Sequence, residues 1–215
     1  MPLKIDLHVH TCYSYDSVIT PKELVVYAKK RGLDAVAVTD HDTIKGALKL
    51  SKHGGLLVIS GIEVSSQYGH VLALNVNERI PSGLDLHATI QEIHEADGIA
   101  IAAHSTALHR GELRKHIIGN FDAVEVINAS SIPFHFSTYA NRKIAEKLNL
   151  PQTGGSDAHY APEIGMAYTL VDADLEEEEI ATAIKNGKVK PCGRAIPLLM
   201  RLKREALNFK KLGRF

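Results

Sequence analysis

The first residues of the chain alternate strictly between apolar and polar side chains. From Leu3 to His10 the odd positions are apolar and the even positions are polar. This period of two predicts a strand, with Asp6, His8 and His10 on one face. The sequence Thr20-Pro21-Lys22-Glu23 then predicts a helix N-terminus with Thr20 as N-cap and Glu23 completing a capping box. We expect this helix to end at Gly32.

Similar patterns recur along the rest of the chain. We expect further strands at 35–39, 56–60, 71–76, 99–103, 123–127 and 167–171, and a sixth parallel strand that leads through Thr153 into 154–159. We expect helices at 43–52, 85–96, 134–148 and from an N-cap at Asp174 to Gly187. Strands that alternate with helices predict parallel βα units and an α/β fold. We interpret residues 1–195 as one domain and residues 196–215 as a basic, helical tail.

Charge is balanced overall but not along the sequence. The 215 residues include 25 basic and 25 acidic ones, yet the segment from Arg194 onward has seven basic residues and one acidic residue. The body of the chain is therefore acidic, which does not favour a dedicated nucleic-acid wrapper. The tail is typical of a packing helix with a solvated basic face, although RNA, an anionic substrate or an acidic partner could also bind there.

Several sequence features bear on location. The apolar runs are too short to span a bilayer, and the N-terminus lacks the apolar region of a signal peptide. The two cysteines, Cys12 and Cys192, make no disulfide framework and indicate a reducing compartment. We expect a cytoplasmic protein without membrane association; its oligomeric state is open.

The twelve histidines are placed unevenly, and many of them follow predicted strands. In a βα barrel the C-terminal ends of the strands form one face, so residues there converge on one pocket. Imidazole and carboxylate groups together suit zinc, iron or manganese. Two such ions about 3.5–4 Å apart can clamp both oxygens of a phosphoryl transfer. The residues at the strand ends are His8, His10, Asp40, His41, Glu63, His104, Asp157 and His159.

Five segments of the chain closely resemble the motifs of the polymerase and histidinol phosphatase family, the PHP family. They are Asp6-Leu7-His8-Val9-His10, Thr39-Asp40-His41, Gly61-Ile62-Glu63, Ala102-Ala103-His104 and Gly155-Ser156-Asp157-Ala158-His159. The resemblance implies a distorted (β/α)7 barrel with three divalent metal ions. It also implies a hydrolase of phosphoric esters.

The resemblance assigns ligands to each ion. One ion would take His8, His10, Glu63 and Asp157, which would hold the attacking water. A second would share Glu63 and add His70 and His104, and a third would take Asp16, His41 and His159. The family resemblance also makes Asp6 and Asp40 supports that hold imidazole N–H groups.

We therefore expect a metal-dependent phosphoesterase that acts on a small phosphomonoester or a nucleotide. Candidate substrate-binding residues are His109, Arg110 and Asn128, because they lie on loops or strand ends over the pocket. One alternative is an exonuclease for DNA or RNA ends, supported by the basic tail. Another is a non-catalytic subunit of a polymerase or ribonucleoprotein complex, which the complete set of candidate ligands disfavours.

Overall fold

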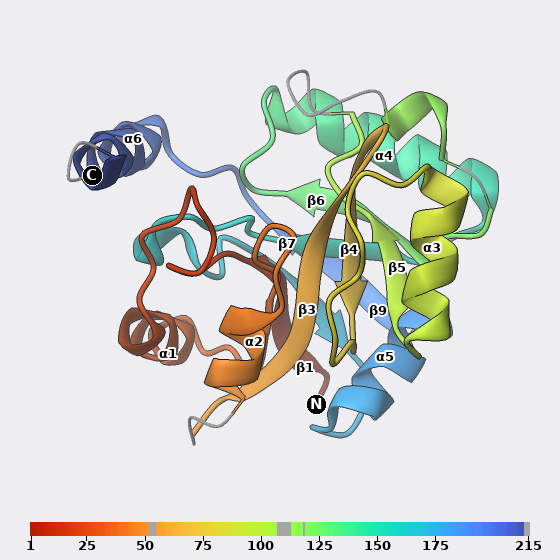
Figure 1. Ribbon diagram of the computed structural model, residues 1–215, viewed down its shortest axis with the longest axis horizontal. Helices are drawn as coiled ribbons and strands as arrows, with labels where there is room; N and C mark the ends of the chain where they lie inside the picture. The colour runs from red at the N-terminus through yellow and green to blue at the C-terminus, as the bar shows by residue number, and fades with distance from the viewer. Residues whose placement is uncertain (52–54, 107–112, 118, 213–215) are drawn as a thin grey trace.

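Nine strands form one mixed sheet in the computed structural model, which describes residues 1–51, 55–106, 113–117 and 119–212 (Figure 1). The order across the sheet is β7-β6-β5-β4-β3-β2-β1-β8-β9. The strands are β1 (Leu3–Val9), β2 (Ala35–Val38), β3 (Leu57–Ser66), β4 (Gly69–Leu74), β5 (Ile99–Ala102), β6 (Ala123–Asn128), β7 (Gln152–Gly155), β8 (Ala167–Val171) and β9 (Val189–Gly193). The helices are α1 (Pro21–Lys30), α2 (Lys45–Leu50), α3 (Leu86–Glu95), α4 (Phe134–Leu148), α5 (Glu177–Lys185) and α6 (Leu198–Leu212), with short 3₁₀ turns at Leu113–Lys115 and Ala161–Glu163.

The sheet curls until its first strand meets the segment after β7. The backbone N–H of Asp157 donates to the carbonyl of His8 at 2.8 Å, and that of His10 donates to the carbonyl of Ala158 at 3.0 Å. These bonds nearly close the sheet into a barrel, which confirms the predicted α/β, barrel-like fold. They also bring the two histidine-rich ends of β1 and β7 together.

The distortion of the barrel comes from strands that run against the others. Strands β1, β2 and β3 pair in parallel, as do β5, β6 and β7. Between these two groups, β4 is antiparallel to both β3 and β5. Strand β8 is antiparallel to β1 and to β9. The strand expected at 167–171 is followed by β9 at the edge of the sheet, which was not among the expected strands.

Two clusters of buried apolar side chains pack on the sheet. The larger includes residues of α1, α2 and α3, such as Leu24, Leu50 and Ile93. The smaller joins strand residues to α5 through Ile180 and Ile184. The helices are therefore fixed by their apolar faces, which leaves the strand ends to form the site.

Local signals decide where the helices begin. At α1 the Thr20 side chain accepts the N–H of Glu23 at 3.3 Å, and the Glu23 carboxylate accepts the N–H of Thr20 at 2.9 Å, so the predicted capping box is confirmed. At α5 the N-cap is Glu176 rather than the expected Asp174. In place of the helix expected at 43–52, the described residues form the shorter helix α2 (Lys45–Leu50).

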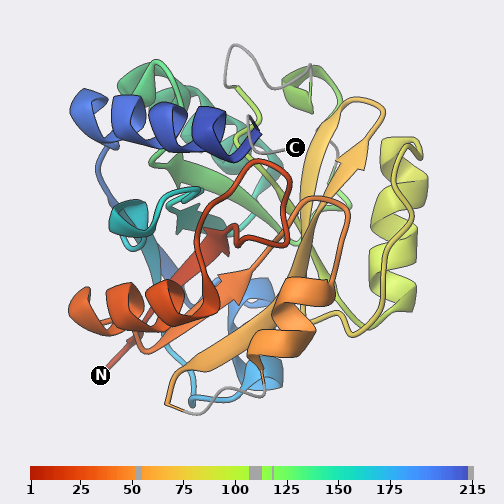
Figure 2. The same ribbon diagram turned by 60° about the vertical axis from the view of Figure 1, so that its left-hand side comes forward.

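The basic tail does not extend away from the barrel. Ile196 is 3% exposed and belongs to the larger apolar cluster, and its N–H donates to the carbonyl of Ala129 at 2.9 Å. Helix α6 begins two residues later and lies across one end of the barrel, above the loop between β1 and α1 (Figure 2). Within the described residues, no helix has both the length and the apolar character needed to span a membrane.

Candidate metal centre

The structure gathers the predicted ligands at one end of the barrel. His10, His41, His104 and Asp157 each lie just beyond the C-terminal end of a strand. Glu63 was expected to end its strand, but β3 continues to Ser66 and pairs with β4, which carries His70. Among the described residues, ligand atoms within 4.8 Å of one another form three sets: His8, His10, Glu63 and Asp157; His10, Asp16, His41 and His159; and His41, Glu63 and His70.

Glu63 lies at the middle of this cluster and is fully buried. Its Oε2 is 3.2 Å from His8 Nε2 and 3.0 Å from His10 Nε2. Its Oε1 is 2.8 Å from His70 Nδ1 and 2.8 Å from His104 Nε2. The two oxygens of one carboxylate thus face two different pairs of histidines, an arrangement suited to a bridge between two cations.

Asp16 is the carboxylate of the predicted set for the third ion. Its Oδ2 lies 3.0 Å from His159 Nε2 and 3.3 Å from His41 Nε2. His41 turns its other ring nitrogen toward Glu63 Oε2, at 3.5 Å. The third predicted set is therefore brought together, and His41 connects it to the central carboxylate.

Asp157 lies close to histidines of two predicted ligand sets, the set for the first ion and the set for the third ion. Its Oδ1 is 3.6 Å from His8 Nε2, 3.4 Å from His10 Nε2 and 3.4 Å from His159 Nδ1. Asp157 has φ +53° and His104 has φ +27°, which are unfavourable for residues with a side chain. Strain of this kind is typical of residues whose position is set by a site.

The ionisation of the cluster follows from its packing. Burial would raise the pKa of Glu63, but the imidazoles of His70, His8 and His41 outweigh burial and hold this pKa well below its usual range. Burial would lower the pKa of His10, but hydrogen bonds to Asp157 and Glu63 raise it to about 9. Glu63 is therefore a carboxylate at neutral pH, as a ligand must be.

The donor set fits divalent cations. His8 Nε2 and His10 Nε2 lie 3.1 Å apart, and both face the same oxygen of Glu63. Once these imidazoles lose their protons, as metal binding requires, the three atoms would offer lone pairs to one small volume. Imidazole and carboxylate groups of these sets match zinc, manganese or iron better than magnesium or calcium.

Asp6 and Asp40 have other partners than expected. Asp6 accepts backbone N–H groups from Ser156 and Gly165, each at 2.8 Å. Asp40 accepts the backbone N–H of Thr11 at 2.6 Å and its hydroxyl at 2.7 Å. The prediction that they hold imidazole N–H groups is corrected: both carboxylates fix loop backbone beside the ligands.

The carboxylate that does support an imidazole is Glu125 in β6, which the sequence reasoning missed. Its Oε1 is 3.0 Å from His8 Nδ1, and its Oε2 accepts the backbone N–H of His104 at 2.9 Å.

Asn128 donates to Oε2 of Glu125 at 3.0 Å and to Asp157 Oδ2 at 3.3 Å. Asn128 is 2% exposed and its amide donates to two carboxylates, so its role in substrate binding stays a prediction. His109 and Arg110 lie outside the described residues.

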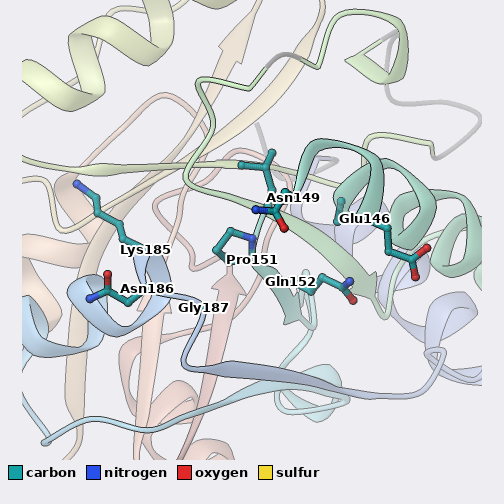
Figure 3. Close-up of a pocket in the computed structure, with 9 residues that line it drawn as sticks. Glu146, Asn149, Pro151, Gln152, Lys185, Asn186 and Gly187 are labelled. Atoms are coloured by element: carbon teal, nitrogen blue, oxygen red, sulfur yellow. The ribbon is translucent and has the colours of Figure 1, made fainter.

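A small cavity lies beside the candidate metal centre, and a larger one lies away from it. A cavity of about 210 Å³ is lined by Asp16, His159 and three α6 residues, Arg204, Glu205 and Asn208. A larger one of about 580 Å³ lies between the ends of α4 and α5 (Figure 3). Gln152 in its wall begins β7, whereas the metal-ligand candidates follow the end of β7, so this larger cavity is at the opposite end of the barrel.

Several known proteins are similar to this chain in sequence. The chain is 40% identical over 160 residues to an uncharacterized protein of Methanocaldococcus jannaschii, covering 68% of this chain and 94% of that protein. It is 33% identical over 108 residues to a 5'-3' exoribonuclease of Haemophilus influenzae and 34% over 103 residues to a phosphoribosyl 1,2-cyclic phosphate 1,2-diphosphodiesterase of Eggerthella lenta. These two matches cover 47% and 44% of this chain, but only 39% of either relative.

A solved structure supports the fold, and two families match the sequence. A two-domain protein from Bacteroides vulgatus, described as containing a predicted PHP-like metal-dependent phosphoesterase, superposes with a TM-score of 0.72 at 20% identity, over 90% of this chain and 65% of that one. The PHP-associated family matches residues 120–189, and the PHP domain family matches residues 6–130, more than half of the chain. The chain therefore belongs to the PHP domain family.

Proposed function

We propose that this member of the PHP family, a metal-dependent hydrolase of phosphoric esters, acts on a small phosphomonoester or a nucleotide. The observation that carries the proposal is Glu63, a buried carboxylate whose two oxygens face separate histidine pairs. Divalent ions held there would neutralise the phosphoryl oxygens and supply hydroxide at neutral pH. No serine or cysteine nucleophile is required for this chemistry.

We assign three ions to the ligands that the sequence predicted. His8, His10, Glu63 and Asp157 would hold the first ion and the attacking water. The second ion would be held by Glu63, His70 and His104. The third would be held by Asp16, His41 and His159. The ligands of the first and third ions lie within two sets whose ligand atoms are within 4.8 Å of one another, and a further set joins His41 to Glu63 and His70. For the second ion the support is Glu63 Oε1, which lies 2.8 Å from both His70 Nδ1 and His104 Nε2.

Other residues of the chain keep these ligands in place. Glu125 next to His8 Nδ1 favours the tautomer with its proton on Nδ1, so that Nε2 carries the lone pair toward the centre. Asn128 donates to Asp157 Oδ2 and leaves Oδ1 turned toward the histidines. These contacts preorganise the site before substrate binds.

The size of the cavity beside the centre supports a small substrate. Its volume of about 210 Å³ is bounded by Asp16 and His159 on the barrel side and by α6 on the other. This space suits a phosphate with a small group attached. The two-cysteine composition supports the further proposal that the protein acts in the cytoplasm.

The test is phosphate release by the purified full-length protein. The substrates are sugar phosphates, mononucleotides, bisphosphorylated nucleotides and short oligonucleotides, each with manganese, zinc or iron. We expect release from at least one small substrate, and a loss of at least about 100-fold in kcat/KM for Glu63→Gln and for Asp157→Asn. Glu95→Gln is the matched control, because Glu95 is an exposed carboxylate on α3. Full activity in both site variants would overturn the proposal.

An exonuclease is the second candidate, favoured by the exoribonuclease relative and by the basic residue Arg204 of α6, which lines the cavity beside the centre. It predicts that 5'-phosphorylated oligonucleotides are shortened one nucleotide at a time, with a higher kcat/KM than any mononucleotide. The same substrate panel decides between the two candidates, because the small-substrate proposal predicts a higher kcat/KM for a small substrate than for the oligonucleotides.

A further inference from the structure

Helix α6 is attached to the barrel by polar side chains beside the candidate metal centre. Arg201 donates to the carbonyls of Ala129 at 2.9 Å and Ser130 at 2.8 Å. Asn208 donates to the carbonyl of Asp16 at 2.9 Å, on the loop that carries this candidate ligand. The helix thus has a defined position, with one face over the cavity.

Arg204 is the basic residue of that face. Its side chain is 13% exposed and lines the same cavity as Asp16 and His159. The guanidinium is therefore withdrawn from bulk water and lies beside two groups that would hold an ion. Lys203, the preceding residue, is exposed and does not line the cavity.

The contacts of Arg204 leave part of its guanidinium available. Nη1 is 3.3 Å from Ser130 Oγ and 3.5 Å from Glu163 Oε1, and Nε is 3.1 Å from Glu205 Oε1. A charge-assisted N–H···O bond is usually about 2.7–2.9 Å long, so the pair with Glu163 is loose. Within the described part of the chain, these contacts of Arg204 use Nη1 and Nε but not Nη2.

Glu163 is better explained as a support for the loop than as the partner of Arg204. It is fully buried, and its Oε2 accepts the backbone N–H groups of His159 at 3.0 Å and Tyr160 at 3.2 Å. Its other oxygen faces Arg204. The loose ion pair thus places the guanidinium against the loop that carries His159.

We propose that Arg204 binds the phosphate group of the substrate, so that the C-terminal helix supplies one wall of the active site. The inference rests on the proposed function. A phosphate held by metal ions still presents peripheral oxygens, and a guanidinium offers a planar pair of N–H donors to them. The basic tail, whose role the sequence left open, is thereby assigned to an anionic substrate rather than to an extended nucleic-acid track.

The experiment compares Arg204→Met with Lys203→Met in the full-length, metal-loaded protein. Both variants remove one positive charge from α6 and keep a good helix former, but only one faces the cavity. The readouts are metal content, the Kd of inorganic phosphate by titration calorimetry, and kcat and KM for the best substrate of the panel. Hydrogen exchange of the α6 amides checks that the helix stays in place; if it does not, Arg204→Gln replaces Arg204→Met.

We expect Arg204→Met to raise the Kd of phosphate and the KM by about 10- to 100-fold with unchanged metal content. Arg204→Lys should be intermediate, because it keeps the charge but not the paired donors. Lys203→Met should stay within about twofold of the wild type. Wild-type phosphate binding by the Arg204 variant, or an equal loss in Lys203→Met, would overturn the inference.

The two proposals fail in different ways. If the wild type hydrolyses nothing in the panel, the proposed function is wrong. If the wild type is active and the Arg204 variants bind phosphate normally, only the role of Arg204 is wrong.

Discussion

Glu125 Oε1 lies 3.0 Å from His8 Nδ1, on the opposite side of the imidazole from Glu63. The two residues are 117 positions apart in sequence and both are buried. This contact fixes the orientation of His8 as a candidate ligand, because a carboxylate on one ring nitrogen sets the tautomer and increases the basicity of the other.

Substitution of Glu125 by glutamine should weaken metal binding. The amide introduced by Glu125→Gln would turn an N–H group toward the backbone N–H of His104 or toward His8, since Glu125 accepts from both sides. We expect a loss of about 10- to 100-fold in affinity for manganese or zinc, measured by competition with a chelator. Glu95→Gln is the control, and equal affinities in the two variants would contradict the role of Glu125.

The sequence predicted the strand ends and the histidines there, but not Glu125. A single glutamate inside the apolar strand Ala123-Val124-Glu125-Val126-Ile127 is an unusual signal, since an unpaired buried carboxylate is costly. What the sequence cannot provide is its partner, because the contact with His8 depends on how the barrel closes. For the same reason the sequence places Asp6 and Asp40 correctly beside the ligands but gives them the wrong partners.

Strand β9 was missed for a different reason. Its sequence Val-Lys-Pro-Cys-Gly lacks alternation and contains a proline. Proline is tolerated here because β9 is an edge strand that pairs only with β8 among the described strands. The antiparallel direction of β4 was not predicted either, because its apolar run indicates a strand but not which way the strand runs.

Binding of metal ions should stabilise the fold. A ligand present at about 100 times its Kd adds about 2.7 kcal/mol to the free energy of unfolding. For a chain of this length that corresponds to a rise in Tm of about 5–10 °C. Because the chain has no tryptophan, scanning calorimetry with and without a chelator is the suitable measurement. In Glu63→Gln most of this rise in Tm should be lost, and in Glu95→Gln none of it should be lost. A wild-type Tm that does not change when a chelator is added would contradict the metal centre.

Gly155 should not tolerate a side chain. A Cβ at this position would lie 2.5 Å from His8 Cβ and 2.9 Å from Glu125 Oε1, so one of these groups must move. We expect Gly155→Ala to lower the free energy of unfolding by about 1–3 kcal/mol and to weaken metal binding. In Gly119→Ala the added Cβ has no atom within 4 Å, which makes this exposed position the matched control. Chemical denaturation and metal titration of both variants test the prediction, and equal behaviour would refute it.

Asp6 should make the stability of the metal-free protein depend on pH. Burial raises the pKa of Asp6 from 3.8 to about 6, although N–H groups of Ser156, Gly165 and His8 oppose the shift. A carboxyl with a raised pKa in the folded state stabilises the fold below about pH 3.8, and this contribution is lost as the pH rises through about 6. At about 1.36 kcal/mol for each pKa unit, the loss is about 3 kcal/mol.

Comparison with Asp6→Asn isolates this contribution. Asparagine would place an N–H group against the N–H of Gly165, but that cost does not change with pH. We therefore expect the free energy of unfolding of the wild type, relative to Asp6→Asn, to fall by about 2.4 kcal/mol between about pH 4 and about pH 7. Urea denaturation followed by circular dichroism in the presence of a chelator measures both proteins. Because all other carboxyl groups are shared, parallel pH profiles would show that Asp6 is ionised at the same pH in the folded and unfolded chains.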